Sequence, residues 1–341
     1  MRAAFINGKE DLSLRETPTP EPGEGQLRIR VDYVGICGSD LHYYYEGANG
    51  AFVVAEPLIP GHEVSGRVDL DPSGELAVGT PVTVHPATFG TPTPELEGKR
   101  HLWPNGAYLG SASTTPHTQG ALSEYLLVDR GMVRVLPPTL PVRRAVLAEP
   151  LAVALHGLSK AGSVEGKRVL VTGSGPIGLL SVAAAVAAGA AEVHATDVLD
   201  GPLARAAALG ASAGFNVTRD AIPASAYDVV LECSGVAASV SAAFAAARIA
   251  GTVVQVGMVP NEPRPVNLAP FISKELSVFG TFRFNDEIDA AIELLDAVPG
   301  IEDVITHEVP ADDTLAAFGF ARDSSASGKV VVAVWPEDVR G

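Results

Sequence analysis

Three types of metal-binding side chain occur close together in the first part of the chain. Cys37 lies in the run GICGSDLH, at residues 35–42, and His62 and Glu63 follow the segment LIPG. A further carboxylate, Glu149, lies in the segment AEP at residues 148–150. Thiolate, imidazole and carboxylate are the usual ligands of zinc, and a zinc ion with an open coordination position is catalytic. Each residue alone is more often structural, but together they predict a catalytic zinc site.

A second motif predicts a dinucleotide site. Residues 173–178 read GSGPIG, which follows the apolar segment RVLVT and precedes the Ala-rich segment IGLLSVAAAVAA. In this strand–turn–helix context Gly173 permits the tight turn, Gly175 lets the backbone approach the pyrophosphate, and Gly178 lets the helix pack close to the strand. The first helical turn, with Pro176 and Ile177, presents free N–H groups to the phosphates.

Asp197 ends the next predicted strand. A carboxylate at that position accepts hydrogen bonds from the adenosine ribose and repels a 2′-phosphate, so the sequence predicts NAD rather than NADP. Arg205 lies downstream and partly offsets this charge. The alternative, ordinary turn glycines with a solvated aspartate, does not explain why strand, helix and acid occur in register.

The composition limits the classes of protein to which this chain can belong. The 341 residues carry 24 Lys and Arg against 40 Asp and Glu, a formal net charge of −16, so we expect no nucleic-acid partner. The only two cysteines, Cys37 and Cys233, cannot build a disulfide framework, and no signal peptide is recognisable at the N-terminus. We therefore expect a cytoplasmic protein. The uncharged segment Val169–Ala191 is broken near its front by glycines and a proline, so we expect no membrane span and no membrane partner.

Two kinds of domain are needed to position these motifs. The length indicates two domains, at about 150 residues each. Up to about residue 145, short apolar runs between Gly/Pro turns predict an irregular β domain. From about residue 167, apolar strands alternate with Ala-rich helices, which predicts a doubly wound parallel sheet and hence an α/β fold. The expected strands of that sheet are 168–172, 192–196, 214–217, 227–233, 252–256 and 276–280, and the expected helices are 177–188, 203–209 and 238–249. A later helix (287–297) and a final strand (329–334) are expected to return to the first domain.

These motifs carry a resemblance to a known family. GICGSDLHYYYEGANGAF, LIPGHEVSG, AEPLAVALHG, VTGSGPIG and GTFRF are similar to segments of the zinc-dependent medium-chain dehydrogenases/reductases, in the sorbitol/polyol dehydrogenase branch. The resemblance covers essentially the whole chain. It implies a GroES-like catalytic domain at 1–146, completed by 285–341, a Rossmann domain at 147–284, and an active site between them.

The resemblance also implies roles for individual residues. Cys37 and His62 would be zinc ligands, with Glu63 as the third ligand and Glu149 near the metal, bound directly or through water. It leaves open which of the two glutamates coordinates the ion. Zinc would acidify a bound alcohol, which then gives a hydride to the nicotinamide. Its proton would leave through the hydroxyl of Ser39, the nicotinamide ribose and His42.

Further contacts follow from the same resemblance. Tyr43, Arg283 and Phe284 would line the substrate pocket, together with Glu149 and His117. The remaining expected cofactor contacts are Val256, Gly257, Met258, Thr281, Phe282 and Arg283. Each substrate contact has an ordinary alternative: Tyr43 as packing, Arg283 as a cofactor contact only, and His117 as an exposed loop residue.

The chain departs from its family in one loop. Many relatives hold a second, structural zinc with four cysteines, but residues 85–111 contain none. We therefore predict one zinc per chain and no structural zinc, with the loop held by packing of Leu102, Trp103 and Tyr108. Cys233 is predicted to be a thiol of the protein core.

The substrate follows least directly from the sequence. Sorbitol enzymes typically have Arg-Tyr where this chain has Arg283-Phe284, and a guanidinium suits the carboxylate of a sugar acid. We therefore expect NAD-linked oxidation of a sugar acid or polyol, with L-idonate first, sorbitol or xylitol as the alternative, and threonine more distant. A nucleotide-binding regulatory protein without catalysis is a further alternative, disfavoured because the zinc and relay residues are all present. We expect a homodimer or homotetramer, with segments 252–256 and 268–278 at a sheet-edge interface.

Overall fold

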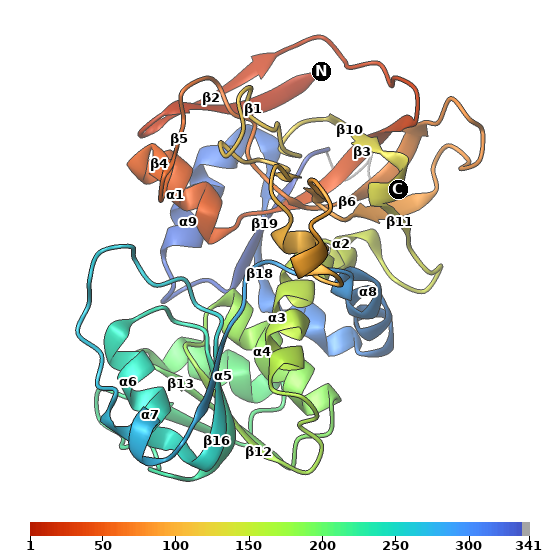
Figure 1. The fold of residues 1–341 in the computed structure, drawn as a ribbon. Helices are drawn as coiled ribbons and strands as arrows, with labels where there is room; N and C mark the ends of the chain where they lie inside the picture. Colours follow the sequence, from red (N-terminus) through yellow and green to blue (C-terminus); the bar gives the residue numbers. More distant parts are fainter. Residues whose placement is uncertain (336–341) are drawn as a thin grey trace.

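Two sheets organise residues 1–335, the part of the chain that this computed structural model describes (Figure 1). The first has the strand order β11-β7-β6-β3-β19-β18, with β10 also paired to β3. Its strands are β3 (Gln26–Gly35), β6 (Glu63–Leu70), β7 (Pro81–Val84), β10 (Tyr125–Asp129), β11 (Val133–Val135), β18 (Ile305–Pro310) and β19 (Lys329–Ala333). Three short antiparallel pairs flank it: β1 (Arg2–Gly8) with β2 (Asp11–Glu16), β4 (Ala48–Asn49) with β5 (Phe52–Val53), and β8 (Ala87–Thr88) with β9 (Ala107–Tyr108).

The alternation of side chains in β3 explains why it lies at the centre of this sheet. Leu27, Ile29 and Val31 are fully buried, whereas Arg28 and Arg30 between them are half-buried. A strand with this period of two buries one face in the core and leaves charged groups on the other. The C-terminal strand β19 pairs antiparallel with β3, so the tail of the chain lies in the same sheet as its beginning.

The second sheet is parallel and has the order β14-β13-β12-β15-β16-β17, as expected for a doubly wound α/β fold. Its strands are β12 (Arg168–Thr172), β13 (Glu192–Asp197), β14 (Ala213–Asn216), β15 (Tyr227–Glu232), β16 (Ala247–Gln255) and β17 (Ser277–Gly280). The main helices of the chain are α1 (Gly38–Glu46), α2 (Val142–Ala145), α3 (Ala148–Lys160), α4 (Pro176–Ala187), α5 (Asp200–Ala208), α6 (Ala237–Ala246), α7 (Ala269–Ser273), α8 (Glu287–Ala297) and α9 (Thr314–Arg322).

One predicted boundary is wrong. The helix expected over 238–249 ends at Ala246, and residues 247–249 begin β16. Ala247 pairs with Tyr227 of β15, and the register then shifts before Thr252. The sheet pairing of this segment therefore overrides the helix preference of its alanines.

Helix α3 connects the two sheets. Its buried face, which includes Leu151, Ala152, Ala154 and Leu158, belongs to the core cluster that also contains buried residues of α4 and α8. In Figure 1 α3, α4 and α8 lie between the upper and lower parts of the molecule. Glu149, in the first turn of α3, is therefore placed near the junction of the two sheets.

The cysteine-free loop 85–111 is held differently from the prediction. Leu102 is 41% exposed and Trp103 is half-buried, so only Tyr108 of the three expected residues is in the core. The β8–β9 pair closes the loop, and the N–H of Thr91 donates to the carbonyl of Pro104 at 2.8 Å. Arg100 lies 4.4 Å from the ring centroid of Phe89. Cross-strand pairing and a cation–π contact thus stabilise this loop.

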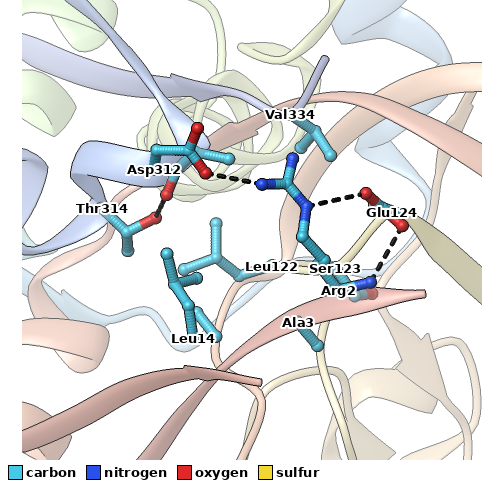
Figure 2. A pocket seen from close by; sticks show the side chains of 11 residues that line it. Arg2, Ala3, Leu14, Leu122, Ser123, Glu124, Asp312, Thr314 and Val334 are labelled. Atoms are coloured by element: carbon cyan, nitrogen blue, oxygen red, sulfur yellow. Dashed lines mark hydrogen bonds and ion pairs between the residues drawn. The ribbon is translucent and has the colours of Figure 1, made fainter. Parts of the chain in front are cut away.

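A small cavity lies beside β1, and Arg2 in its lining forms ion pairs with Glu124 and Asp312 (Figure 2). Arg2 donates from Nε to Glu124 at 3.0 Å and from Nη1 to Asp312 at 2.6 Å. The free volume is about 20 Å³, which is room for about one water molecule. This cavity is too small for a sugar or a nucleotide. Separately, no helix within residues 1–335 combines the length and the apolarity needed to cross a bilayer.

Candidate active site

Cys37, His62 and Glu63 come together at the ends of two adjacent strands. Cys37 follows β3 and precedes α1, and Glu63 begins β6, opposite Gly35 of β3. One ligand atom from each of the three lies within 4.8 Å of the others. Within residues 1–335 this is the only cluster of three or more His, Cys, Asp or Glu ligand atoms that close together. The donor set, one sulfur, one nitrogen and one oxygen, fits zinc.

Asp40 holds the two ligand-bearing segments together, a role that the sequence did not reveal. Its buried carboxylate accepts the N–H of Cys37 at 2.9 Å and the N–H of Gly61 at 3.0 Å. Burial raises the pKa of Asp40, although both hydrogen bonds and His62 oppose that shift. Two backbone donors from the ligand loops therefore fix the separation of Cys37 and His62.

The site has a negative electrostatic field. Burial lowers the pKa of the His62 imidazole, but Cys37, Asp40 and Glu149 raise it more, and the net pKa lies well above the ordinary value. A field that favours the cationic form of an imidazole also attracts a metal cation. The residues present therefore fit zinc both by donor type and by charge.

Lys329 is a second residue that sequence reasoning missed. Its Nζ donates to Glu63 Oε1 at 2.6 Å and to the carbonyl of Ile36 at 3.1 Å. Both Lys329 and Glu63 are about fully buried, at 2% and 1% exposure. The other oxygen, Glu63 Oε2, is buried without a hydrogen-bond partner. Lys329 thus occupies one oxygen of Glu63 and leaves the second available to an ion.

Glu149 has a different environment at the start of α3. Its Oε1 accepts the hydroxyl of Tyr108 at 2.5 Å, and burial raises its pKa. The Tyr108 ring also packs edge-on against His62, with centroids 5.5 Å apart. Tyr108, expected only as loop packing, therefore links the cysteine-free loop to Glu149 and to a ligand.

The two expected relay residues lie on α1. Ser39 is half-buried in the first turn of the helix. The side chain of His42 is 53% exposed, and its Nδ1 lies 3.0 Å from Glu46 Oε1. Ser39 therefore lies two residues from Cys37 and His42 lies at the surface of the same helix; their relay role stays a prediction.

Two of the expected substrate contacts have well-defined partners of their own. Tyr43 is buried, and its hydroxyl lies 3.2 Å from Ser111 Oγ and accepts the N–H of Ala112 at 3.1 Å. His117 is also buried, not the exposed loop residue of the alternative. Its Nδ1 lies 2.9 Å from the carbonyl of Thr114, and its Nε2 accepts the N–H of Ala55 at 3.0 Å. Both ring nitrogens of His117 are thus used by the backbone.

Arg283 lies over the same region, after β17. Its guanidinium is 4.2 Å from the ring centroid of Tyr108 and 4.9 Å from that of Phe282. Its φ of 52° is left-handed, which is uncommon for a residue other than glycine and occurs often at functional sites. The next residue, Phe284, is buried against His85, with centroids 4.7 Å apart.

The residues of the expected dinucleotide site lie in the turn between β12 and α4. Gly175 caps α4 with open space where a Cβ would be, whereas a Cβ at Gly178 would lie 1.8 Å from the carbonyl oxygen of Gly173. Pro176 and Ile177 form the first turn of α4. Asp197 ends β13, where its carboxylate accepts the N–H groups of Ser174 and Leu199, each at 3.0 Å.

The other expected cofactor residues follow β16 and β17 at the same edge of the sheet. The N–H groups of Val256 and Gly257 both donate to the carbonyl of Glu232, at 2.8 and 2.7 Å. Met258 and Phe282 are exposed, at 75% and 43%. In doubly wound folds ligands bind beyond the carboxyl ends of the strands, where these exposed side chains lie.

Comparison with known families agrees with this arrangement. A family described as "Alcohol dehydrogenase GroES-like domain" matches residues 23–138, and one described as "Zinc-binding dehydrogenase" matches residues 176–297. The two matches correspond to the first sheet and to the parallel sheet. They define the class as a zinc-binding dehydrogenase.

Individual relatives indicate the branch of zinc-binding dehydrogenases to which the chain is similar. L-idonate 5-dehydrogenase (NAD(P)(+)) of Escherichia coli is 33% identical over 336 residues, covering 96% of this chain and 97% of the relative. Its crystal structure superposes with a TM-score of 0.92 at 32% identity and covers 98% of both chains. Sorbitol dehydrogenase of Bos taurus is 33% identical over 353 residues, covering 98% of this chain and 96% of the relative. A zinc-binding dehydrogenase of Sinorhizobium meliloti, solved with NADP, has a TM-score of 0.88 at 29% identity, with 98% and 99% coverage.

The chain therefore belongs to the zinc-dependent medium-chain dehydrogenases, in their polyol dehydrogenase branch. The expected α/β class, a GroES-like domain with a Rossmann-type parallel sheet, is confirmed. The protein is an oxidoreductase that uses zinc and a nicotinamide cofactor on a small-molecule substrate.

Proposed function

We propose that this protein oxidises a secondary alcohol of a sugar acid with NAD, and that L-idonate is its first candidate substrate. The observation that supports a sugar-acid substrate is the environment of Arg283. Within residues 1–335 no carboxylate forms an ion pair with its guanidinium, which stacks on Tyr108 instead. Burial lowers the pKa of Arg283, although the nearby charge of Glu149 opposes that shift, so a directly bound anion is favourable there. A substrate carboxylate supplies that partner in a bidentate geometry.

The metal is assigned to Cys37, His62 and Glu63. The free Oε2 of Glu63 supports this glutamate over Glu149, whose Oε1 is held by Tyr108. When bound, zinc supplies Lewis acidity that lowers the pKa of an alcohol. This thiolate site is proposed as the one catalytic zinc of the chain, without a four-cysteine structural zinc.

The remaining steps are performed by groups of the chain. Ser39 accepts the alcohol proton through its hydroxyl, and His42, exposed on the same helix, delivers it to solvent. Asp197 holds the adenosine ribose, since its carboxylate is fixed by two backbone N–H groups. These residues would orient the alcohol against the nicotinamide, which when bound would supply the hydride acceptor.

NAD is proposed over NADP because the negative charge of Asp197 opposes a 2′-phosphate. The nearby Arg205 is already engaged, donating to the carbonyls of Ser324 and Ser327 at 3.3 and 3.1 Å. This leaves the guanidinium less available to a phosphate. The ratio of kcat/KM for the two cofactors tests the assignment, and a preference for NADP would contradict it.

Homodimerisation is proposed through β17, with a homotetramer as the alternative. β17 is the edge strand of the parallel sheet, and its Val278 and Phe279 are 39% and 44% exposed. Leu268 and Ile272 add exposed apolar surface beside it, at 51% and 70%. An apolar, unpaired edge is normally covered by another chain.

A sugar alcohol is the second candidate substrate, supported by the similarity to sorbitol dehydrogenases. NAD reduction measured across L-idonate, D-gluconate, sorbitol, xylitol and L-threonine separates the candidates. Arg283→Ala should lower kcat/KM for L-idonate by about 10- to 100-fold, the value of a charge-assisted hydrogen bond, and lower that for sorbitol much less. An equal loss on both would reject the carboxylate contact and leave Arg283 to the cofactor.

Cys37→Ala tests catalysis itself. Loss of the thiolate should abolish turnover and reduce zinc content while NAD binding persists. Retained activity in this variant would contradict the proposed mechanism. A wild-type protein that binds NAD but is purified without zinc, or that holds zinc and still turns over none of the five substrates, would favour the regulatory alternative.

A further inference from the structure

A buried carboxylate lies at the edge of the parallel sheet where the cofactor is expected. Glu232 ends β15 and is fully buried, at 0% exposure. Its Oε1 accepts the N–H of Ser234 at 3.0 Å, the hydroxyl of Ser234, and the hydroxyl of Thr172 at 3.3 Å. Its Oε2 accepts the N–H of Gly235 at 3.0 Å and the side-chain amide of Gln255. Neither the zinc site nor the dinucleotide contacts described above include this group.

The donors around Glu232 are those of an ionised carboxylate. Three of them are N–H groups, which donate and cannot accept, and Oε2 has no other partner. Within residues 1–335, no lysine, arginine or histidine forms an ion pair with Glu232. Buried charges are normally paired with an opposite charge. The negative charge of Glu232, balanced only by neutral donors, therefore calls for an explanation.

The Glu232 carboxylate joins the two loops that follow β15 and β16. Gly235 lies after β15, whereas Gln255 ends β16 and also donates to the carbonyl of Gly257 at 2.8 Å. A Cβ at Gly257 would lie 2.3 Å from the backbone nitrogen of Gly235, so the loops touch backbone to backbone. Met258, which is 75% exposed, continues the second loop. The hydrogen bonds of one carboxylate thus fix both loops.

These loops lie on the side of the sheet where the reactive half of the cofactor is expected. The glycine motif follows β12, and Asp197, the proposed ribose contact, ends β13 on one side of it, whereas β15 and β16 lie on the other side. The zinc site lies on that other side too, because Arg283 after β17 stacks on Tyr108, which packs against His62. A hydride acceptor must lie beside the alcohol. The nicotinamide half is therefore expected over the ends of β15 and β16.

We propose that Glu232 is a positioning residue for the nicotinamide half of the cofactor, and that its negative charge favours the oxidised ring over the reduced ring. This inference rests on the proposed dehydrogenase function. The oxidised ring carries a positive charge and the reduced ring is neutral, so a fixed buried anion attracts only the first. Two unit charges about 10 Å apart, at an effective dielectric constant of about 20, change a binding constant by roughly tenfold. The charge thereby favours entry of NAD⁺ and release of NADH.

Separate titrations of zinc-loaded holoenzyme with NAD⁺ and with NADH test this role. Glu232→Gln removes the charge. Gln255→Lys neutralises it, while the ammonium keeps donors for both Glu232 and the carbonyl of Gly257. In each variant the Kd for NAD⁺ divided by the Kd for NADH should rise by about three- to tenfold. The fluorescence of bound NADH, and its displacement by NAD⁺, give the two constants.

Thr172→Val is the matched control, because it removes one donor to the carboxylate and keeps the charge. It should change both affinities by a common factor and leave their ratio at the wild-type value. A role in holding the loops alone predicts the same common factor for Glu232→Gln. A ratio unchanged in either charge variant, or an equal rise in Thr172→Val, would therefore overturn the inference.

Two features of the experiment keep its outcomes separate. Gln255→Lys retains the carboxylate, so the test does not depend on the folding of Glu232→Gln. A wild type that binds neither form of the cofactor would overturn the proposed function together with this inference. An unchanged ratio, in variants of a wild type that binds both forms, would overturn the inference alone.

Discussion

The ion pair between Lys329 and Glu63 offers a quantitative test of how the zinc site is built. Lys329→Met removes the ammonium and keeps an unbranched side chain of similar length. In the metal-free protein the Glu63 carboxylate, 1% exposed, then has no cationic partner. The carbonyl of Ile36 also loses the donor that lies 3.1 Å away.

The expected cost follows from burial. Removing one member of a buried ion pair costs about 3–5 kcal/mol, because the other charge remains desolvated. This pair is at 2.6 Å and nearly inaccessible to water, so solvent screening does little to reduce that figure. The double variant Lys329→Met/Glu63→Gln buries no charge and should recover more than about 2 kcal/mol of the loss.

Urea unfolding of EDTA-treated protein, followed by circular dichroism, measures these free energies. Lys329→Arg is the control that keeps the charge. In zinc-loaded protein the penalty of Lys329→Met should shrink, because the ion offers Glu63 a second cationic partner. A loss below about 1 kcal/mol in metal-free protein, or no recovery in the double variant, would refute the argument. A penalty unchanged by zinc would instead count against Glu63 as a ligand.

Three further predictions concern other parts of the molecule. Gly178→Ala places a Cβ 1.8 Å from the Gly173 carbonyl oxygen, so α4 must shift. The affinity for NADH, measured by fluorescence titration, should therefore fall by about tenfold. An unchanged affinity would show that the helix does not position the phosphates. Burial raises the pKa of the Cys233 thiol to about 12. In native metal-free protein at about pH 8, iodoacetamide should therefore label Cys37 and spare Cys233, as read by peptide mass spectrometry. Labelled Cys233 would contradict this. Phe279→Asp on the edge strand should reduce the mass found by light scattering to that of a monomer, and an unaltered mass would exclude this edge as the interface.

The repeating part of the fold could be predicted because its pattern is local. The expected strand Arg168–Thr172 and helix Glu287–Ala297 coincide with β12 and α8. Both are marked by periodic apolar residues with glycine, proline or acidic residues at their ends. The boundary at Ala247 was wrong because pairing with another strand, rather than local preference, determines it.

Of the candidate site, only the metal ligands could be predicted from the sequence. Cys37, His62 and Glu63 have diagnostic chemistry, whereas Asp40 and Lys329 act through contacts that depend on tertiary structure. One indication was present: Lys329 opens an otherwise apolar strand that was expected to return to the first domain. Since a buried lysine needs a partner, the strand should have prompted a search for an unpaired carboxylate.

The loop without cysteines shows the same limit. The absence of cysteines predicted no four-thiolate zinc there, but it did not indicate which contacts hold the loop. The contact of His101 with His156 joins residues of separate segments, which no local pattern in the sequence indicates. Only the folded arrangement shows that the two imidazoles meet.

The position of Lys329 also imposes an order on how the molecule is completed during synthesis. Lys329 reaches Glu63 across 266 residues and Ile36 across 293. At translation rates of about 5–20 residues per second, the first strands wait on the order of tens of seconds for β19. The strands of the parallel sheet, from Arg168 to Gly280, are contiguous and need no such wait. The parallel sheet, second in the chain, is thus able to pair its strands first, and the metal pocket is completed only when β19 joins β3.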